Sequence, residues 1–424
     1  MLLRFRFSNY RSFRDEADLS LVASSLNDSP ESTFSVAGLK ERVLPVAAIY
    51  GANASGKTNV IRAFQFMCEA VKESHRSWAP DGSIPSNVFV SRAAAGAASS
   101  FEVDFLVDGI RHRYGFNLDA KIIVEEWLRV RPNGKWQTWF KRRSGEPISF
   151  GSKLSGENRT IEALTRQNSL FLSAAAQNNH PTLSPIYSWF SNSVRFVLDR
   201  TLLLQATTVL CGDDHSRKSI AEFVAGADLG IAGVNVEQRQ VPDLAKRLIE
   251  FMRTEGSAKE LPAPPPDLSF PEAHMMHRIS GDVFSFDQGS ESNGTLAYFA
   301  LLGPVVAALR DGGAICVDEL DASLHPLLST RIIELFNDTS RNPHGAQLIF
   351  NTHDTNLLHN LRRDEIWFTE KDREGNSTLY PLTDFKPRRH ENLENGYLQG
   401  RYGAIPFINA DAFLSAVGDD GEKA

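Results

Sequence analysis

Residues 51–58 read Gly-Ala-Asn-Ala-Ser-Gly-Lys-Thr, after an apolar run that ends at Tyr50 and before a segment with apolar side chains at helical spacing. The pattern GxxxxGK followed by Ser or Thr, set between a strand and a helix, predicts a loop that binds phosphate groups. Its glycines allow backbone N–H groups to turn towards one anion, and the start of the helix adds its positive dipole end. The predicted nucleotide-binding residues are Gly51, Asn53, Ala54, Ser55, Gly56, Lys57, Thr58 and Asn59.

Such a loop needs an acidic partner that helps to hold a metal ion. We expect Lys57 to reach the β- and γ-phosphates of ATP, and the Thr58 hydroxyl to bind Mg²⁺. The apolar run Ala314–Val317 predicts a strand that ends in Asp318 and Glu319. Asp318 is the second predicted metal residue, acting through water, and Glu319 is predicted to orient and polarise the attacking water. Because Asp318 comes so far after Lys57, a large segment is inserted between the two halves of the site.

Two further motifs indicate which kind of ATPase this is. His353 follows a predicted strand over Gln347–Asn351, and in this place it resembles the switch histidine of ABC-type ATPases, which contacts the γ-phosphate. Upstream, Ser292, Asn293 and Gly294 open a predicted helix and resemble the ABC signature in a variant form. The alternatives are a structural histidine and an ordinary helix cap formed by Ser292.

Longer stretches extend this resemblance over nearly the whole chain. Residues 7–13 resemble the first strands of RecF- and SMC-like ATPases, and residues 318–326 resemble their Walker B motif and D-loop. The tail over residues 396–406 fits the same group. Together these motifs resemble the small RecF/OLD-like AAA ATPases of bacteria, grouped with the ATPase subunits of the AbiL and PARIS anti-phage systems.

The chain departs from this group in three respects. His325 stands where transporters have the D-loop aspartate, and no Q-loop glutamine is secure, with Gln137 and Gln167 as candidates. Long SMC coiled coils are missing, because no heptad pattern persists.

The predicted fold class is α/β: an ABC/RecF-type P-loop ATPase head with a mostly parallel sheet, antiparallel N-terminal strands and a helical insert. We expect an N-terminal half of the head over residues 1–160 and a C-terminal half over residues 271–424. Residues 161–270 are the predicted insert, with helices over Ile161–Leu170 and Asp243–Met252 and the proline-rich connector Leu261–Pro266.

Composition narrows the cellular setting. The formal net charge of -7 gives no global attraction to DNA or to acidic membranes. Basic runs at residues 141–143 and 386–389 leave local contacts with nucleic acid open, although most such runs are solvated surface. The three cysteines are far apart and form no CxxC pair, which favours a reducing cytoplasm. Neither a signal peptide nor a membrane span is expected.

The function that these motifs favour is a Mg²⁺-dependent ATPase that acts as a dimeric, nucleotide-driven switch. ATP would lie between the P-loop of one chain and Ser292–Gly294 of the other, and the switch would control a protein effector, a toxin or nuclease, in anti-phage defence. The alternative is a RecF-like ATPase that binds DNA in repair or recombination. A third hypothesis, a hydrolase with a metal site at His274 and His277, lacks a nearby acidic cluster.

Overall fold

The structure is a computed structural model that describes residues 1–26, 28, 30–36, 38–89, 97–240 and 269–406. The helix expected over Asp243–Met252 and the connector Leu261–Pro266 lie outside these residues. In the described part of the chain, every helix is too short or too polar to cross a membrane.

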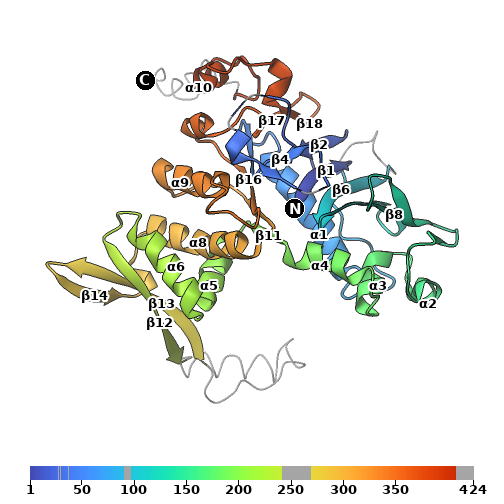
Figure 1. The fold of residues 1–424 in the computed structure, drawn as a ribbon, viewed down its shortest axis with the longest axis horizontal. Helices are drawn as coiled ribbons and strands as arrows, with labels where there is room; N and C mark the ends of the chain where they lie inside the picture. Colours follow the sequence, from blue (N-terminus) through green and yellow to red (C-terminus); the bar gives the residue numbers. More distant parts are fainter. Residues whose placement is uncertain (27, 29, 37, 90–96, 241–268, 407–424) are drawn as a thin grey trace, which may run out of the picture.

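A six-stranded sheet forms the centre of the molecule, with strand order β11-β15-β16-β5-β17-β18 (Figure 1). Its first five strands are parallel and the edge strand β18 is antiparallel, which confirms the mostly parallel sheet. Three of the strands are buried at every position, and such strands read as near-continuous apolar runs. The strands are β5 (Val46–Gly51), β11 (Val194–Val197), β15 (Ala314–Val317), β16 (Gln347–Asn351), β17 (Ile366–Lys371) and β18 (Ser377–Pro381).

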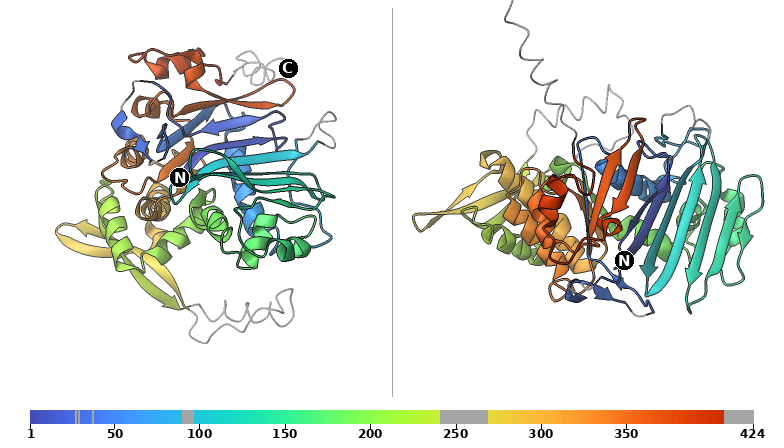
Figure 2. Two further views of the ribbon diagram at one scale, coloured as in Figure 1. Left: turned by 45° about the vertical axis from the view of Figure 1, so that its right-hand side comes forward. Right: turned by 90° about the horizontal axis from the view of Figure 1, so that it is seen from above.

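A second sheet of seven antiparallel strands stands beside the first, in the order β10-β9-β8-β7-β6-β1-β2 (Figure 2). It confirms the predicted antiparallel N-terminal strands. Its strands are β1 (Leu2–Ser8), β2 (Ala17–Ser20), β6 (Ser99–Val107), β7 (Ile110–Leu118), β8 (Ile123–Arg131), β9 (Gln137–Arg143) and β10 (Ser149–Phe150). A small ribbon of β3 (Phe34–Ser35) and β4 (Arg42–Val43) lies near the N-terminus.

Helix α1 (Lys57–Glu73) packs in the apolar core between the two sheets. Phe64 of α1 contacts Phe5 of β1 with ring centroids 4.8 Å apart, and Ala47 and Ile49 of β5 belong to the same core. Three helices from the next part of the chain complete this layer, namely α2 (Asn158–Leu164), α3 (Phe171–Gln177) and α4 (Ser184–Asn192).

The opposite face of the central sheet carries a second core, because Val46, Ala48 and Tyr50 alternate with the residues that face α1. This face is covered by α5 (Arg200–Leu210), α6 (Asp214–Ala225), α8 (Asn293–Asp311), α9 (Pro326–Asn337) and α10 (Leu393–Leu398). Short 3₁₀ segments are η1 (Pro30–Ser32), η3 (Gln288–Ser290), η4 (Thr355–Asn360) and η5 (Leu382–Phe385).

The segment expected to be a helical insert also contains strands. Strand β11 joins the central sheet beside β15, and β12 (Ile231–Gln240) pairs with β13 (Ser269–Ile279). With β14 (Asp282–Phe286), these two strands form a three-stranded sheet that projects from the helical side (Figure 1). Pairing partners far away in the sequence override the local helical pattern here.

Two helix boundaries differ from the sequence prediction. The helix expected over Ile161–Leu170 ends at Leu164, because the chain turns extended at Thr165. The carbonyl groups of Arg166 and Ser169 then accept hydrogen bonds from the Arg142 guanidinium. The helix that follows the Asp-Glu pair, for which the sequence pattern predicts Ser323–Phe336, begins at Pro326, a residue favoured in the first helical turn.

Glu126 of β8 ties the seven-stranded sheet to α3. Its fully buried carboxylate accepts hydrogen bonds from the backbone N–H of Phe171 (2.7 Å) and Leu172 (3.0 Å) and from the Tyr114 hydroxyl (2.9 Å). Arg142 lies 3.7 Å away as its ion-pair partner. Burial raises the pKa of Glu126, while Arg142 and the N–H donors oppose this rise. The start of α3 therefore depends on one buried carboxylate.

We expect Glu126→Ala to destabilise the protein by about 3–5 kcal/mol, because it leaves Arg142 buried without its charge partner. Denaturant unfolding would measure the loss. The matched control is Glu125→Ala on the same strand, which removes a partly exposed carboxylate that pairs with Lys141 and Arg143 and should cost less than about 1 kcal/mol. Equal losses in the two variants would contradict this role for Glu126.

Candidate nucleotide site

Two positions in the loop after β5 require glycine. Gly56 has φ 115°, and a Cβ atom there would lie 2.6 Å from the Ser377 hydroxyl oxygen. A Cβ atom at Gly51 would lie 2.4 Å from the Thr369 carbonyl oxygen. The loop is thus held against β17 and the start of β18, directly before α1 begins.

Lys57 is the first residue of α1 and is buried. Its ammonium group donates hydrogen bonds to the carbonyl oxygens of Gly51 (2.8 Å) and Ala52 (3.0 Å). Burial lowers the pKa of Lys57 to about 8, although the nearby carboxylates of Glu319, Asp321 and Asp318 act in the opposite direction. The lysine therefore sits where it can reach terminal phosphates, with a proton that is easier to lose than usual.

The ends of three neighbouring parallel strands meet at the candidate metal position. The Thr58 hydroxyl donates a hydrogen bond to Asp318 Oδ1 (2.8 Å), and the Asn351 side-chain amide donates to the same oxygen. A hydroxyl and a carboxylate are oxygen ligands of the kind that Mg²⁺ prefers, in company with phosphate oxygens and water. Thr58 and Asp318 therefore fit the predicted metal role in kind and in position.

Glu319 follows directly, is exposed, and lines the edge of the same site. Its backbone is in the left-handed region, with φ 54°, and its N–H group donates to Asn351 Oδ1 (2.6 Å). Asn351 thus positions both acidic residues at once, a role that the sequence analysis missed. The sequence does contain one sign of this role. Asn351 is a polar residue at the end of an apolar strand, two positions before His353, and a buried polar side chain needs a hydrogen-bond partner.

His353 lies at the mouth of the site, next to the D-loop. Its backbone N–H donates to Asp321 Oδ2 (3.3 Å). Partial burial lowers the pKa of His353, and the positive charge of Lys57 lowers it further. A neutral imidazole at physiological pH can donate one hydrogen bond to a phosphate oxygen.

These residues line one cavity of about 510 Å³. It brings together seven consecutive residues of the loop and of the first turn of α1, 53–59, with Glu319, Asn351 and His353. Gly51 and Asp318 do not line this cavity themselves. Gly51 lies against Thr369, and Asp318 accepts its hydrogen bond from Thr58, which does line the cavity. Lys371, the last residue of β17, adds a second cation to the cavity wall. No sequence motif marks Lys371, because its place depends on the pairing of β17 with β5.

The predicted signature residues lie elsewhere. Ser292 caps α8 by accepting a hydrogen bond from the Thr295 backbone N–H (3.1 Å), and both Ser292 and Asn293 are exposed. A Cβ atom at Gly294 would lie 3.1 Å from the Ser323 carbonyl oxygen, so α8 starts against the D-loop. None of the three lines the cavity that holds Lys57.

The remaining sequence candidates are also outside the cavity. Gln137 begins β9, and Gln167 is exposed between α2 and α3, so neither occupies a Q-loop position at the cavity wall. His325 caps α9 by accepting a hydrogen bond from the Leu327 backbone N–H (3.3 Å). His277 contacts Glu291 and lies on β13, and among the described residues no group of three or more His, Cys, Asp or Glu side chains could hold a metal ion.

Comparison with known protein families shows to which family a chain with these motifs belongs. Residues 46–359, which include the P-loop, Ser292–Gly294, the Asp318–Glu319 pair and His353, match the family described as "AAA domain, putative AbiEii toxin, Type IV TA system". The chain belongs to this family. The predicted RecF/SMC-like ABC-type ATPase class and its α/β head are confirmed. The closer resemblance to AbiL and PARIS subunits stays a prediction.

Solved structures of SMC heads are similar to the chain at low identity. An SMC head bound to the C-winged helix domain of ScpA is 15% identical, over 89% of this chain and 96% of that chain, with a TM-score of 0.46. The SMC head domain from Thermotoga maritima is 14% identical, over 90% and 98%, with a TM-score of 0.40. An SMC head with an extended coiled coil, bound to the C-terminal domain of ScpA derived from Pyrococcus furiosus, is 14% identical, over 90% and 97%, with a TM-score of 0.37. The chain matches no curated protein.

The lowered pKa of Lys57 predicts how ATP binding depends on pH. Below its pKa of about 8, Lys57 carries the charge that attracts phosphate, and above it binding must first recover a proton. ATP affinity should therefore fall about tenfold between neutral pH and about pH 9. Calorimetric titration at several pH values would measure the fall. Lys57→Arg keeps its charge over this range, so an equal fall in that variant would assign the effect to another group.

Proposed function

We propose that this protein binds and hydrolyses ATP with Mg²⁺ as a head-to-tail homodimer, and that its nucleotide state controls a protein effector. The observation that carries the proposal is that the nucleotide motifs lie in two separate places on one chain. Lys57, Thr58, Glu319 and His353 meet at one cavity, whereas the signature at the start of α8 is exposed outside it. A second chain, related by a two-fold axis, would supply its own signature to complete the site.

The residues of the cavity have distinct roles in this proposal. The loop N–H groups and Lys57 bind the phosphates, and Thr58 and Asp318 hold the metal ion. When bound, Mg²⁺ would neutralise charge on the phosphate oxygens. Glu319 accepts the proton of the attacking water, oriented by the hydrogen bond from its backbone N–H to Asn351. The His353 imidazole donates a hydrogen bond to the γ-phosphate.

The segment between the two halves of the head is the proposed coupling element. His277 Nε2 of β13 lies 2.6 Å from Glu291 Oε1, in the residue directly before the signature. The projecting sheet of β12, β13 and β14 is therefore joined to the start of α8. We propose that closure of the dimer over ATP moves this sheet and α5 and α6, and that an effector reads the movement.

The effector proposal rests on the family and on the sequence resemblance. The family description names a putative AbiEii toxin and a Type IV toxin–antitoxin system. A toxin or nuclease under nucleotide control, serving anti-phage defence in the cytoplasm, is the role that best joins this description to the motifs. The three cysteines are free and buried, in keeping with a reducing compartment.

Mixing two inactive variants tests the shared site. Lys57→Ala removes the phosphate-binding lysine, and Asn293→Glu places a carboxylate where the partner's γ-phosphate would lie. An acidic residue in the first helical turn is favourable, so Asn293→Glu should not unfold α8. Each variant alone should be inactive. In an equal mixture, half of the dimers are mixed and keep one intact site, so about a quarter of wild-type ATPase activity should return. If ATPase activity does not recover after verified subunit exchange, the shared site is wrong.

Glu319→Gln tests the base and the switch together. The amide keeps the shape of the side chain but cannot accept the proton, so hydrolysis should fall about 10²–10⁴-fold while ATP binding persists. With ATP, this variant should accumulate as a dimer by light scattering, whereas Lys57→Ala should not.

The same two variants, tagged and purified from the native host, report on the effector. We expect a partner protein to copurify with one variant and to be depleted from the other, because they fix opposite nucleotide states. Hydrolysis at the wild-type rate in Glu319→Gln would show that the base is wrongly assigned. Identical copurifying proteins in both variants would overturn nucleotide control of the effector.

A further inference from the structure

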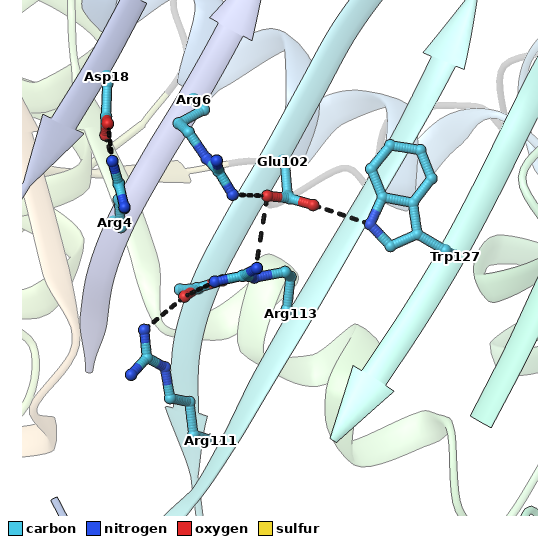
Figure 3. Close-up of polar contacts among 8 residues, drawn as sticks. Arg4, Arg6, Asp18, Glu102, Arg111, Arg113 and Trp127 are labelled. Atoms are coloured by element: carbon cyan, nitrogen blue, oxygen red, sulfur yellow. Dashed lines mark hydrogen bonds and ion pairs between the residues drawn. The ribbon is translucent and has the colours of Figure 1, made fainter. Parts of the chain in front are cut away.

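The seven-stranded sheet presents an arginine-rich surface on the side opposite α1 (Figure 3). We call this side the outer face. Alternation along the strands places four acidic residues on it against eight basic ones, although the whole chain is acidic. The acidic residues are Asp18, Glu102, Asp104 and Glu125, and the basic residues are Arg4, Arg6, Arg111, Arg113, Arg129, Arg131, Lys141 and Arg143.

Like charges stand directly opposite one another across β7 and β8. Arg113 pairs in register with Arg129, and Arg111 with Arg131. Such pairs destabilise a sheet, since opposed side chains lie close together. Asp104 accepts hydrogen bonds from both Arg111 and Arg113 at 2.6 Å, so one carboxylate serves two guanidinium groups.

The β8 arginines have no such compensation. Within the described residues, Arg129 makes no ion pair, and Arg131 donates to the Gly134 carbonyl oxygen (2.8 Å) rather than to an acid. The four acidic residues of the outer face pair with the other six cations, so Arg129 and Arg131 are the positive charge that this face leaves unbalanced.

Aromatic rings lie among these cations. The guanidinium groups of Arg111 and Arg113 lie 5.7 and 5.1 Å from the ring centroid of Trp136, which is 39% exposed. The Trp127 ring lies over Gly115, where a Cβ atom would approach it to 2.5 Å. Its indole N–H donates to Glu102 (2.9 Å), as Figure 3 shows.

A cavity of about 330 Å³ opens on the outer face, and Arg6, Arg113 and Trp127 line its wall together with Glu16 and Glu102. The cavity wall is balanced in charge, so the excess positive charge of the outer face comes from Arg129 and Arg131, and the exposed ring on this face is that of Trp136. Surfaces that bind single-stranded nucleic acid combine a cationic track for phosphates with aromatic rings on which bases stack.

We propose that the outer face binds single-stranded nucleic acid. Arg111, Arg113, Arg129 and Arg131 contact the phosphates, and Trp136 exchanges its arginine contacts for stacking on a base. The inference goes beyond the function proposed above and does not depend on it, because none of these residues lines the nucleotide cavity.

Fluorescence anisotropy with labelled single-stranded DNA and RNA oligonucleotides tests the proposal on the full chain. The double variant Arg129→Ala/Arg131→Ala removes two cations that form no ion pair with a described acid. It should weaken binding and reduce the slope of log affinity against log salt by about 1.4, since each lost phosphate contact contributes about 0.7. The matched control, Arg331→Ala/Arg341→Ala on and beyond α9, removes the same charge from exposed positions and should bind like wild type.

Trp136→Ala separates nucleic acid from an acidic protein segment attracted by the same charge. It should weaken oligonucleotide binding at least about fivefold through lost stacking, and Trp136→Phe should restore much of that loss. A labelled polyglutamate peptide should bind weakly and ignore both changes. ATPase activity should stay at the wild-type level in every variant. Three results would overturn the proposal: no oligonucleotide binding by wild type, equal effects of the two double variants, or tighter binding of duplex or polyglutamate than of single strands.

Discussion

A chain of hydrogen bonds at the carboxyl ends of three parallel strands supports the nucleotide site. Thr58, just after the loop that follows β5, donates to Asp318 at the end of β15. Asn351 at the end of β16 donates to Asp318 and accepts from the Glu319 backbone. Because these strands are neighbours in the central sheet, residues from distant parts of the chain meet within one hydrogen-bond distance of each other. The insert between them can then vary in structure without moving the site, since the buried sheet fixes the three strand ends.

The sequence predicted the features whose information is local. The loop at residues 51–58 and the strands around it follow from a spacing of glycines and apolar runs, and the Asp-Glu pair follows from the strand before it. The position of Lys371 could not be predicted in this way, because it depends on which strand pairs with β5. For the same reason, the local sequence pattern predicts helix where β11 and β12 lie, because each strand is stabilised by a partner more than 25 residues away in the chain.

Residues 141–143 form one basic run in the sequence, but the strand directs their side chains to two opposite faces of the sheet. Lys141 and Arg143 point to the outer face, where both contact Glu125. Arg142 points inward, is buried, and serves Glu126 and the loop before α3. A count of adjacent charges therefore overstates the local cationic patch, while the patch across β7 and β8 is invisible in the sequence because its members come from separate strands.

Helix α1 connects the two surfaces on which the proposals rest. Its first residue is Lys57, whose ammonium lies in the nucleotide cavity, and its apolar side packs on the inner face of the seven-stranded sheet through Phe64 and Phe66. Phe5, which contacts Phe64, lies on β1 between Arg4 and Arg6, whose side chains reach the opposite face. One strand thus separates the helix that begins at the nucleotide cavity from the arginines of the outer face. Tight packing transmits displacements rather than absorbing them, so a shift of α1 on binding ATP would press on the same strand that carries two of the cations. The two surfaces are thus chemically independent, with separate residues and separate ligands, yet they share one packed layer.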